Sequence, residues 1–145
     1  MTTIMTRTVA RLLFVPTLMV AMATLVKGYA DTGDGFTAGV IAALAVLLQF
    51  VAFGHREVAR LLPVRFAPLV AFAGLMLALA VTFASVVRGQ PILTHAPAPG
   101  TAAVHLGTVE FITPVLFDIG VFLLVFGFVV ATIGAFAGRG ERRLP

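Results

Sequence analysis

The sequence predicts an all-α integral membrane protein, a bundle of four transmembrane helices with both termini in the cytoplasm. The chain of 145 residues is 60% hydrophobic and has a mean hydropathy of +1.09, more apolar than a soluble domain requires. Four apolar runs are each about 20 residues long, enough to cross a bilayer core of about 30 Å. The remaining segments are too short for a second core, so residues 1–145 form one predicted domain.

Each apolar run is flanked by charged residues or glycines. Charged residues lie at the ends because a charge is costly in hydrocarbon. The predicted spans are about residues 8–26, 36–53, 66–87 and 112–136. The first run, which ends near Ala21-Met22-Ala23, also resembles a secretory signal, but we interpret it as a retained membrane helix. Residues 88–109 are polar and rich in proline and glycine. We expect this outer loop to fold over the bundle or to contact a partner.

The basic residues predict the orientation of the spans. With four spans, the two termini and the middle loop share one side, which carries eight of the ten basic residues. These eight are Arg7, Arg11, Arg56, Arg60, Arg65, Arg139, Arg142 and Arg143. The opposite side holds Lys27 and Arg88. Because basic loops remain in the cytoplasm, both termini are predicted to be cytoplasmic.

The composition also excludes several classes of function. The chain has no cysteine, which excludes disulfides, iron–sulfur clusters and thiolate zinc sites. The predicted spans contain no histidine, which argues against a haem held by two histidines. His95 and His105 in the outer loop lack further ligand spacing, so we predict no metal and no cofactor. The dispersed basic residues do not indicate nucleic-acid binding.

Asp118 is the most informative residue, because it lies inside the last apolar run. A carboxylate at membrane depth costs about 2.5–3.5 kcal/mol on insertion scales, so it usually faces protein or water. At 1.5 Å per residue, Asp118 lies about 9 Å inside the span, in the outer part of the hydrocarbon. It could act in an ion path, or it could only fix packing through a hydrogen bond. Both roles stay open.

Small residues form a stripe along the same span. On a helical wheel they fall within about 40° of Gly120, and Asp118 lies about 160° from them. The stripe consists of Gly120, Gly127, Ala131, Gly134 and Gly138. Because small side chains let membrane helices approach closely, we predict tight packing at this face, although glycine is common in membrane helices. Gly35 and Gly39 give the second span the same spacing. We expect Asp118 to face another subunit or a hydrated cavity.

The sequence also suggests roles for four further polar residues. Glu110 precedes the last span and suits the N-terminus of a helix, or it could relay ions to Asp118. Asp34, at the start of the second span, would lie near the same outer entrance. Gln49 and Thr82 lie within spans and could form hydrogen bonds between helices, in structural roles.

Several segments resemble one family, the B subunit of the multisubunit, Mrp-type cation/proton antiporter. Residues 34–41 are similar to that family's glycine-rich start of the second span, and residues 115–121 resemble its leucine-phenylalanine-aspartate signature. Residues 91–95 and 106–110 fit its outer loop. The family usually has a proline and three glycines where this chain has Thr32-Gly33-Asp34-Gly35, which adds an acid at the outer face.

The resemblance implies a small non-enzymatic subunit of a hetero-oligomeric complex in the cell membrane of a prokaryote. Such complexes exchange Na⁺ for H⁺, and Asp118, Glu110 and Asp34 would be the ion-path candidates. A B-like subunit of a membrane-bound hydrogenase is the alternative context. A purely structural subunit is the second hypothesis, and it predicts that Gly127→Leu or Gly134→Leu breaks assembly while Asp118→Asn is mild.

Overall fold

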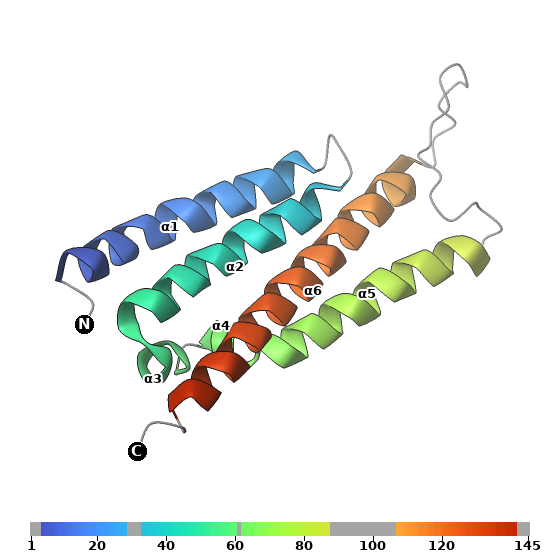
Figure 1. The fold of residues 1–145 in the computed structure, drawn as a ribbon. Helices are drawn as coiled ribbons and strands as arrows, with labels where there is room; N and C mark the ends of the chain where they lie inside the picture. Colours follow the sequence, from blue (N-terminus) through green and yellow to red (C-terminus); the bar gives the residue numbers. More distant parts are fainter. Residues whose placement is uncertain (1–3, 29–32, 61, 88–106, 142–145) are drawn as a thin grey trace.

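The computed structural model describes residues 4–28, 33–60, 62–87 and 107–141, and these residues form four long and two short helices. The long helices are α1 (Ile4–Lys27), α2 (Asp34–Phe53), α5 (Ala67–Val87) and α6 (Gly107–Glu141). The short helices α3 (His55–Val58) and α4 (Leu62–Arg65) lie between α2 and α5 (Figure 1). All four long helices are long and apolar enough to cross a membrane, which confirms the four predicted spans.

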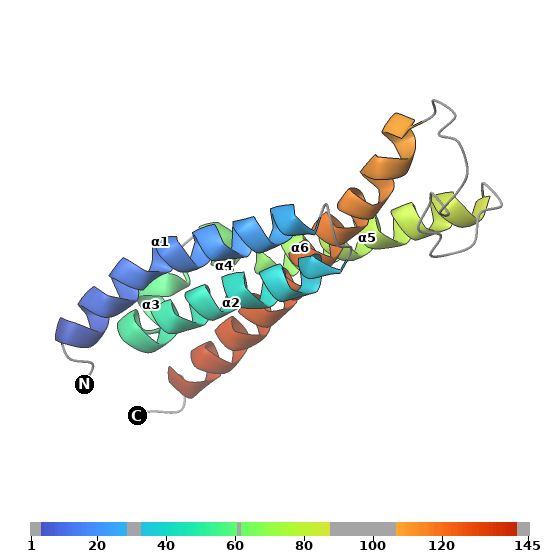
Figure 2. The ribbon, with the colours of Figure 1, turned by 90° about the horizontal axis from the view of Figure 1, so that it is seen from above.

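The long helices lie in the order α1, α2, α6, α5, so the last helix is inserted between the second and the third (Figure 1). The tightest neighbours are the pairs α5–α6, α1–α2 and α2–α6. Both ends of the chain lie at the same end of the bundle as α3 and α4, in both views (Figures 1 and 2). The turn between α1 and α2 lies at the opposite end, beside the first half of α6.

The ends of α6 differ from the prediction. We expected a span over about 112–136, but the helix begins at Gly107 and ends at Glu141. A helix satisfies its own backbone hydrogen bonds, so it continues beyond its apolar part into the interface. Gly138 therefore lies inside the helix and does not end it. A Cβ atom at Gly138 would lie 3.1 Å from His55 Nε2, so glycine leaves room for this imidazole.

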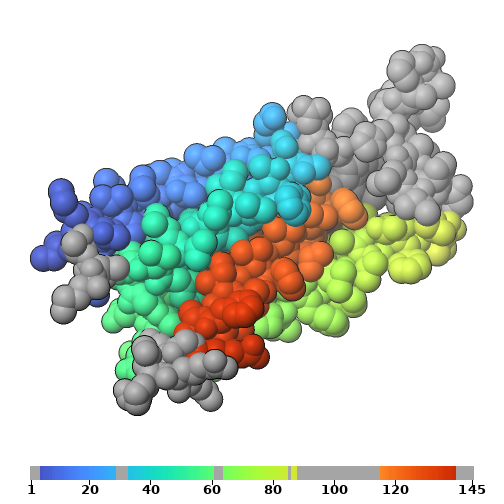
Figure 3. Space-filling model, in the orientation of Figure 1, coloured from blue at the N-terminus to red at the C-terminus, as the bar shows by residue number. Residues whose placement is uncertain are grey.

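Burial is concentrated in α2. Half of its apolar window is buried, against 17% in α5 and in α6 and 11% in α1. Its buried face is rich in alanine, and Val46 and Phe50 pack there with Val130 of α6. In the space-filling view, the surface of α6 lies between those of α2 and α5 and adjoins both (Figure 3). The outward faces of α1 and α5 are apolar and exposed, as expected for helices that contact lipid or other membrane proteins.

Gln49 connects α1 to α2. Its Nε2 donates a hydrogen bond to the carbonyl oxygen of Ala10 at 2.8 Å, and both residues are buried. This confirms the expected bond between helices. The possible bond from Thr82 to another helix does not form, because its hydroxyl donates to Ala78 O of the same helix at 2.8 Å. A threonine hydroxyl within a helix reaches the carbonyl one turn back more easily than a neighbouring helix.

We predict that Gln49→Leu weakens the attachment of α1 to α2. Among the described residues, Gln49 is the only residue of another helix that donates a hydrogen bond to Ala10 O, and leucine cannot donate one. Hydrogen bonds between membrane helices contribute about 0.6 kcal/mol on average and up to about 1.7 kcal/mol. Thermal unfolding of the purified complex should show this loss. Thr82→Val is the matched control, and an equal loss in that variant would contradict the prediction.

Candidate functional site

Helix α6 packs against α5 through its glycines. A Cβ atom at Gly120 would lie 2.9 Å from Ala78 N and 3.1 Å from Gly74 O. A Cβ atom at Gly127 would lie against the backbone of Ala71, with the Cα atom at 2.9 Å. Real Cβ atoms essentially never approach other atoms this closely. The helix axes can therefore be this close only because these positions have no side chain.

The opposite side of α6, which carries Asp118, packs against α2. A Cβ atom at Gly35 would lie 3.0 Å from the Cα atom of Asp118. A Cβ atom at Gly39 would lie 3.0 Å from Phe122 O and from the Cβ atom of Val125. The acid thus faces α2 and the end of α1 in its own chain. We had expected Asp118 to face another subunit or a hydrated cavity. Its neighbours in this structure are instead α2 and the end of α1.

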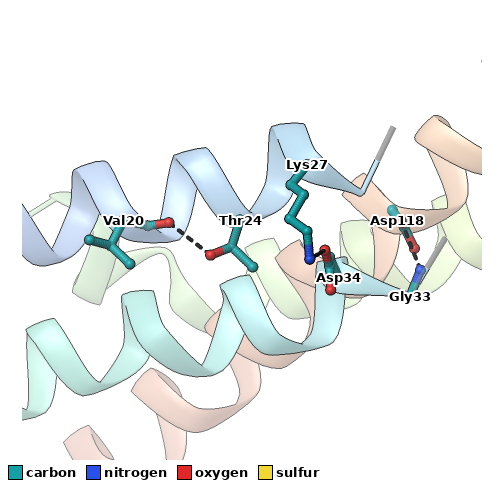
Figure 4. A network of polar contacts seen from close by, with 6 residues as sticks. All are labelled: Val20, Thr24, Lys27, Gly33, Asp34 and Asp118. Atoms are coloured by element: carbon teal, nitrogen blue, oxygen red, sulfur yellow. Dashed lines mark hydrogen bonds and ion pairs between the residues drawn. The ribbon is translucent and has the colours of Figure 1, made fainter. Parts of the chain in front are cut away.

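Asp118 is buried, with 4% of its surface exposed. Its Oδ2 accepts a hydrogen bond from the backbone N–H of Gly33 at 3.2 Å (Figure 4). The same oxygen would lie 3.0 Å from a Cβ atom at Gly28, so Gly28 leaves little space beside the carboxyl group. Gly33 adopts φ +114°, a conformation that favours glycine. The turn before α2 therefore presents a backbone donor to the acid.

Asp34 lies at the same turn and forms an ion pair. Lys27 Nζ, at the end of α1, lies 3.6 Å from Asp34 Oδ2 (Figure 4). The lysine side chain is 68% exposed and the aspartate 25% exposed. That distance is too long for a hydrogen bond, and Asp34 Oδ2 is buried with no hydrogen-bond partner among the described residues. A Cβ atom at Gly28 would lie 3.3 Å from Asp34 Cβ, so any side chain at this position would meet both acids.

The structure therefore brings two of the three ion-path candidates together. Glu110 lies in the first turns of α6, and its side chain is outside the described residues, as is the outer loop with His95 and His105. Among the described residues, Asp118 forms no ion pair with a basic side chain, and no three acids or histidines cluster as a metal site would require. A carboxylate with one backbone donor retains lone pairs that can accept a proton or a cation.

The remaining stripe residues differ in their surroundings. Ala131 packs against the core around Val130, and Gly138 lies on His55. A Cβ atom at Gly134 would meet only Phe50 Cζ at 3.9 Å, an ordinary contact. The stripe is thus tight against the backbone of α5 at Gly120 and Gly127, open at Gly134, and close to the His55 side chain at Gly138.

Sequence reasoning missed the roles of Lys27, Gly28 and Gly33. We interpreted Lys27 only as an orientation signal, although it ends a helix only a short turn before Asp34. Gly28 and Gly33 are the glycines on either side of that turn, and their spacing was the available signal. Which of them would donate to an acid in the last helix depends on helix order, which a single sequence does not specify.

Comparisons with known proteins agree on one family. Residues 5–131 match the family model described as "Domain related to MnhB subunit of Na+/H+ antiporter". The chain is 36% identical to the B subunit of the Na⁺/H⁺ antiporter of Bacillus subtilis over 120 residues, which cover 81% of this chain and 82% of that protein. It is 32% identical to the protein of the same name from Alkalihalophilus pseudofirmus, covering 73% and 72% of the two chains.

A third relative is much longer than this chain. It is named as the probable A/B subunit of a K⁺/H⁺ antiporter of Rhizobium meliloti, and it is 33% identical over 138 residues. The match covers 92% of this chain but 13% of that protein. A region similar to this chain is therefore part of a larger polypeptide in that relative.

Proposed function

Because this chain belongs to the family of the MnhB subunit of Na⁺/H⁺ antiporters, we propose that it is the B subunit of a multisubunit antiporter that exchanges Na⁺ for H⁺. It would be a multi-pass protein of the prokaryotic cell membrane. The matched relatives have antiporter names, which favours this role over a subunit of a membrane-bound hydrogenase. The fold supports the proposal, since four apolar helices with exposed outer faces suit a chain surrounded by lipid and other subunits.

The observation that carries the proposal is the buried carboxyl group of Asp118 beside Asp34. Both acids lie around the α1–α2 turn, at the end of the bundle opposite the two chain termini (Figures 1 and 4). If the termini are cytoplasmic, as the basic residues indicate, this end faces the outside. A cation or proton from outside would first meet Lys27 and Asp34, of which the lysine is exposed and the aspartate partly buried, and then the buried Asp118. We propose that these acids line the outer part of an ion path.

We infer that the direct partner is the large A subunit of the same complex. The Rhizobium meliloti relative, whose name joins A and B, contains a region similar to nearly all of this chain within one much longer polypeptide. Two subunits joined in one chain must lie close together in the assembled complex. The exposed apolar faces of α1 and α5 are the surfaces available to such a membrane partner.

The test is Asp118→Asn in the intact complex. Asparagine retains an oxygen that can accept the Gly33 N–H, so the fold and the assembly should be kept while the charge is lost. We expect cation-dependent proton transport in membrane vesicles to fall by about tenfold or more, because a charge at about 4 Å from a cation contributes several kcal/mol near a protein. Blue-native electrophoresis should show normal assembly.

The structural alternative rests on the Gly33–Asp118 hydrogen bond and predicts a different pattern. Under that alternative, Asp118→Asn would leave transport and assembly at wild-type levels. Asp118→Leu, which cannot accept the Gly33 N–H, would then lose both. Wild-type transport in Asp118→Asn would therefore refute the ion-path role without affecting the family assignment.

A further inference from the structure

A cavity of about 330 Å³ lies at the end of the bundle opposite Asp118, between the start of α1 and the corner where α2 meets α3. It is lined by Ile4, Arg7, Thr8, Arg11, Phe53 and Glu57. Its volume falls at the lower end of the range of about 300–1,000 Å³ that is typical of small-molecule sites. None of these residues takes part in the proposed ion path.

Two arginines converge in this cavity. Arg7 and Arg11 are four residues apart and so lie on one face of α1. Their guanidinium carbons lie 6.0 Å and 5.4 Å from the centroid of the Phe53 ring. Such cation–π contacts hold the guanidinium groups in place without neutralising their charge. Neither arginine forms an ion pair with a carboxylate in the part of the chain that the structure describes.

We propose that this cavity binds the phosphate group of an anionic phospholipid. Two guanidinium groups held on one ring offer a set of planar N–H donors, and this geometry suits phosphate oxygens. Arg7 and Arg11 lie within the first eight residues of an apolar helix, near the end of the predicted span, where a lipid headgroup would meet the hydrocarbon. The cavity is also at the end of the bundle that the basic residues place in the cytoplasmic leaflet.

The surface next to the cavity favours a lipid over a soluble phosphate. Val15 follows Arg11 by one helical turn and is 53% exposed. Leu12 lies beside it and is 72% exposed. An acyl chain attached to a phosphate at Arg11 would lie along these side chains and cover them. A free phosphate ion would gain no contact with them.

Glu57 provides an internal check on the charge of the ligand. Its exposed carboxylate lines the same cavity and would repel an anion there. Removing this charge should therefore strengthen binding, whereas removing an arginine should weaken it. A site for a cationic or neutral headgroup would respond in the opposite direction or not at all.

The experiment measures phospholipid binding to the purified antiporter complex that contains this chain. Native mass spectrometry in detergent would follow titration with phosphatidylglycerol, and phosphatidylcholine would serve as the reference lipid. We expect the Arg7→Gln, Arg11→Gln double variant to bind phosphatidylglycerol about 25-fold more weakly, about fivefold for each basic residue lost. Glu57→Gln should bind it more tightly, and phosphatidylcholine, which has no net charge, should show a much smaller change in both variants.

Arg60→Gln is the matched control, because Arg60 is an exposed arginine at the same end of the bundle but outside the cavity. An equal loss in this variant would show general charge attraction and overturn the proposal, and so would undiminished binding by the double variant. If the double variant does not assemble, Arg7→Lys with Arg11→Lys replaces it, since it keeps the charges that set the orientation but not the planar donors. That variant should lose about fivefold, and wild-type affinity would overturn the proposal.

A competition experiment separates the two sources of phosphate. Inorganic phosphate at millimolar concentration should not displace phosphatidylglycerol, because it gains no contact with Val15 and Leu12. Displacement at that concentration would overturn the lipid assignment and indicate a site for soluble phosphate. The Asp118→Asn variant should bind phosphatidylglycerol normally, so this test is independent of the ion-path proposal.

Discussion

Gly127→Ala is expected to abolish assembly of the complex. The new Cβ atom would lie against the backbone nitrogen and Cα atom of Ala71 in α5, and backbone cannot move aside as a flexible side chain can. Overpacking of this kind costs about 1–3 kcal/mol or more, and here the whole α5–α6 contact would have to open. Blue-native electrophoresis of membranes from cells that express the variant complex would show loss of the assembled band.

Gly134→Ala is the matched control for this prediction. It is in the same helix and stripe, but its new Cβ atom would meet only Phe50 Cζ at 3.9 Å. Alanine favours the helix over glycine by up to about 1 kcal/mol, so this variant should assemble at least as well as the wild type. If the two variants behave alike, the close α5–α6 contact is not what supports assembly.

Gly35→Ala is expected to damage the acid site itself. Its Cβ atom would lie on the backbone of Asp118, so α2 and α6 must separate or shift along one another. Either movement displaces the carboxyl group from the Gly33 N–H, which lies 3.2 Å away. It also moves the carboxyl group relative to the ion pair between Lys27, at the end of α1, and Asp34, at the start of α2. We expect both transport in vesicles and the thermal stability of the complex to fall, the second by about 1–3 kcal/mol.

Thr37→Ala controls for substitution near the start of α2, because Thr37 is exposed and points away from α6. It should leave transport and stability unchanged. Normal transport in Gly35→Ala would show that the acid tolerates a shifted helix. That result would count against a site that depends on the fixed position of Asp118.

The sequence predicted the number of spans, because hydropathy over about 20 residues responds directly to the thickness of the bilayer. It also predicted that α6 has two different faces. The structure agrees on this point: Gly120 packs on α5, and Asp118 packs toward α2. The family resemblance is likewise confirmed by the match over residues 5–131.

What lies opposite each face could not be predicted in the same way. Periodicity gives the direction of a side chain around its helix, but the neighbour depends on the order in which the helices pack. The hydrogen bond from Gly33 to Asp118 also requires a turn at φ +114°, and the composition of the turn shows only that this is allowed. The extension of α6 to Gly107 and Glu141 was missed because hydropathy marks the membrane boundary, while a helix ends where its hydrogen bonding ends.

The Gly33–Asp118 contact also bears on how the protein is made. Gly33 belongs to the first helical hairpin, whereas Asp118 is in the last helix to leave the ribosome. Until α6 is inserted, the glycine face of α2 has no counterpart and the Gly33 N–H has no acceptor in α6. The bond can therefore close only after α6 has been inserted beside α2. A nascent chain that stops before α6 leaves the glycine face of α2 uncovered. Membrane quality control can act on an uncovered surface of this kind.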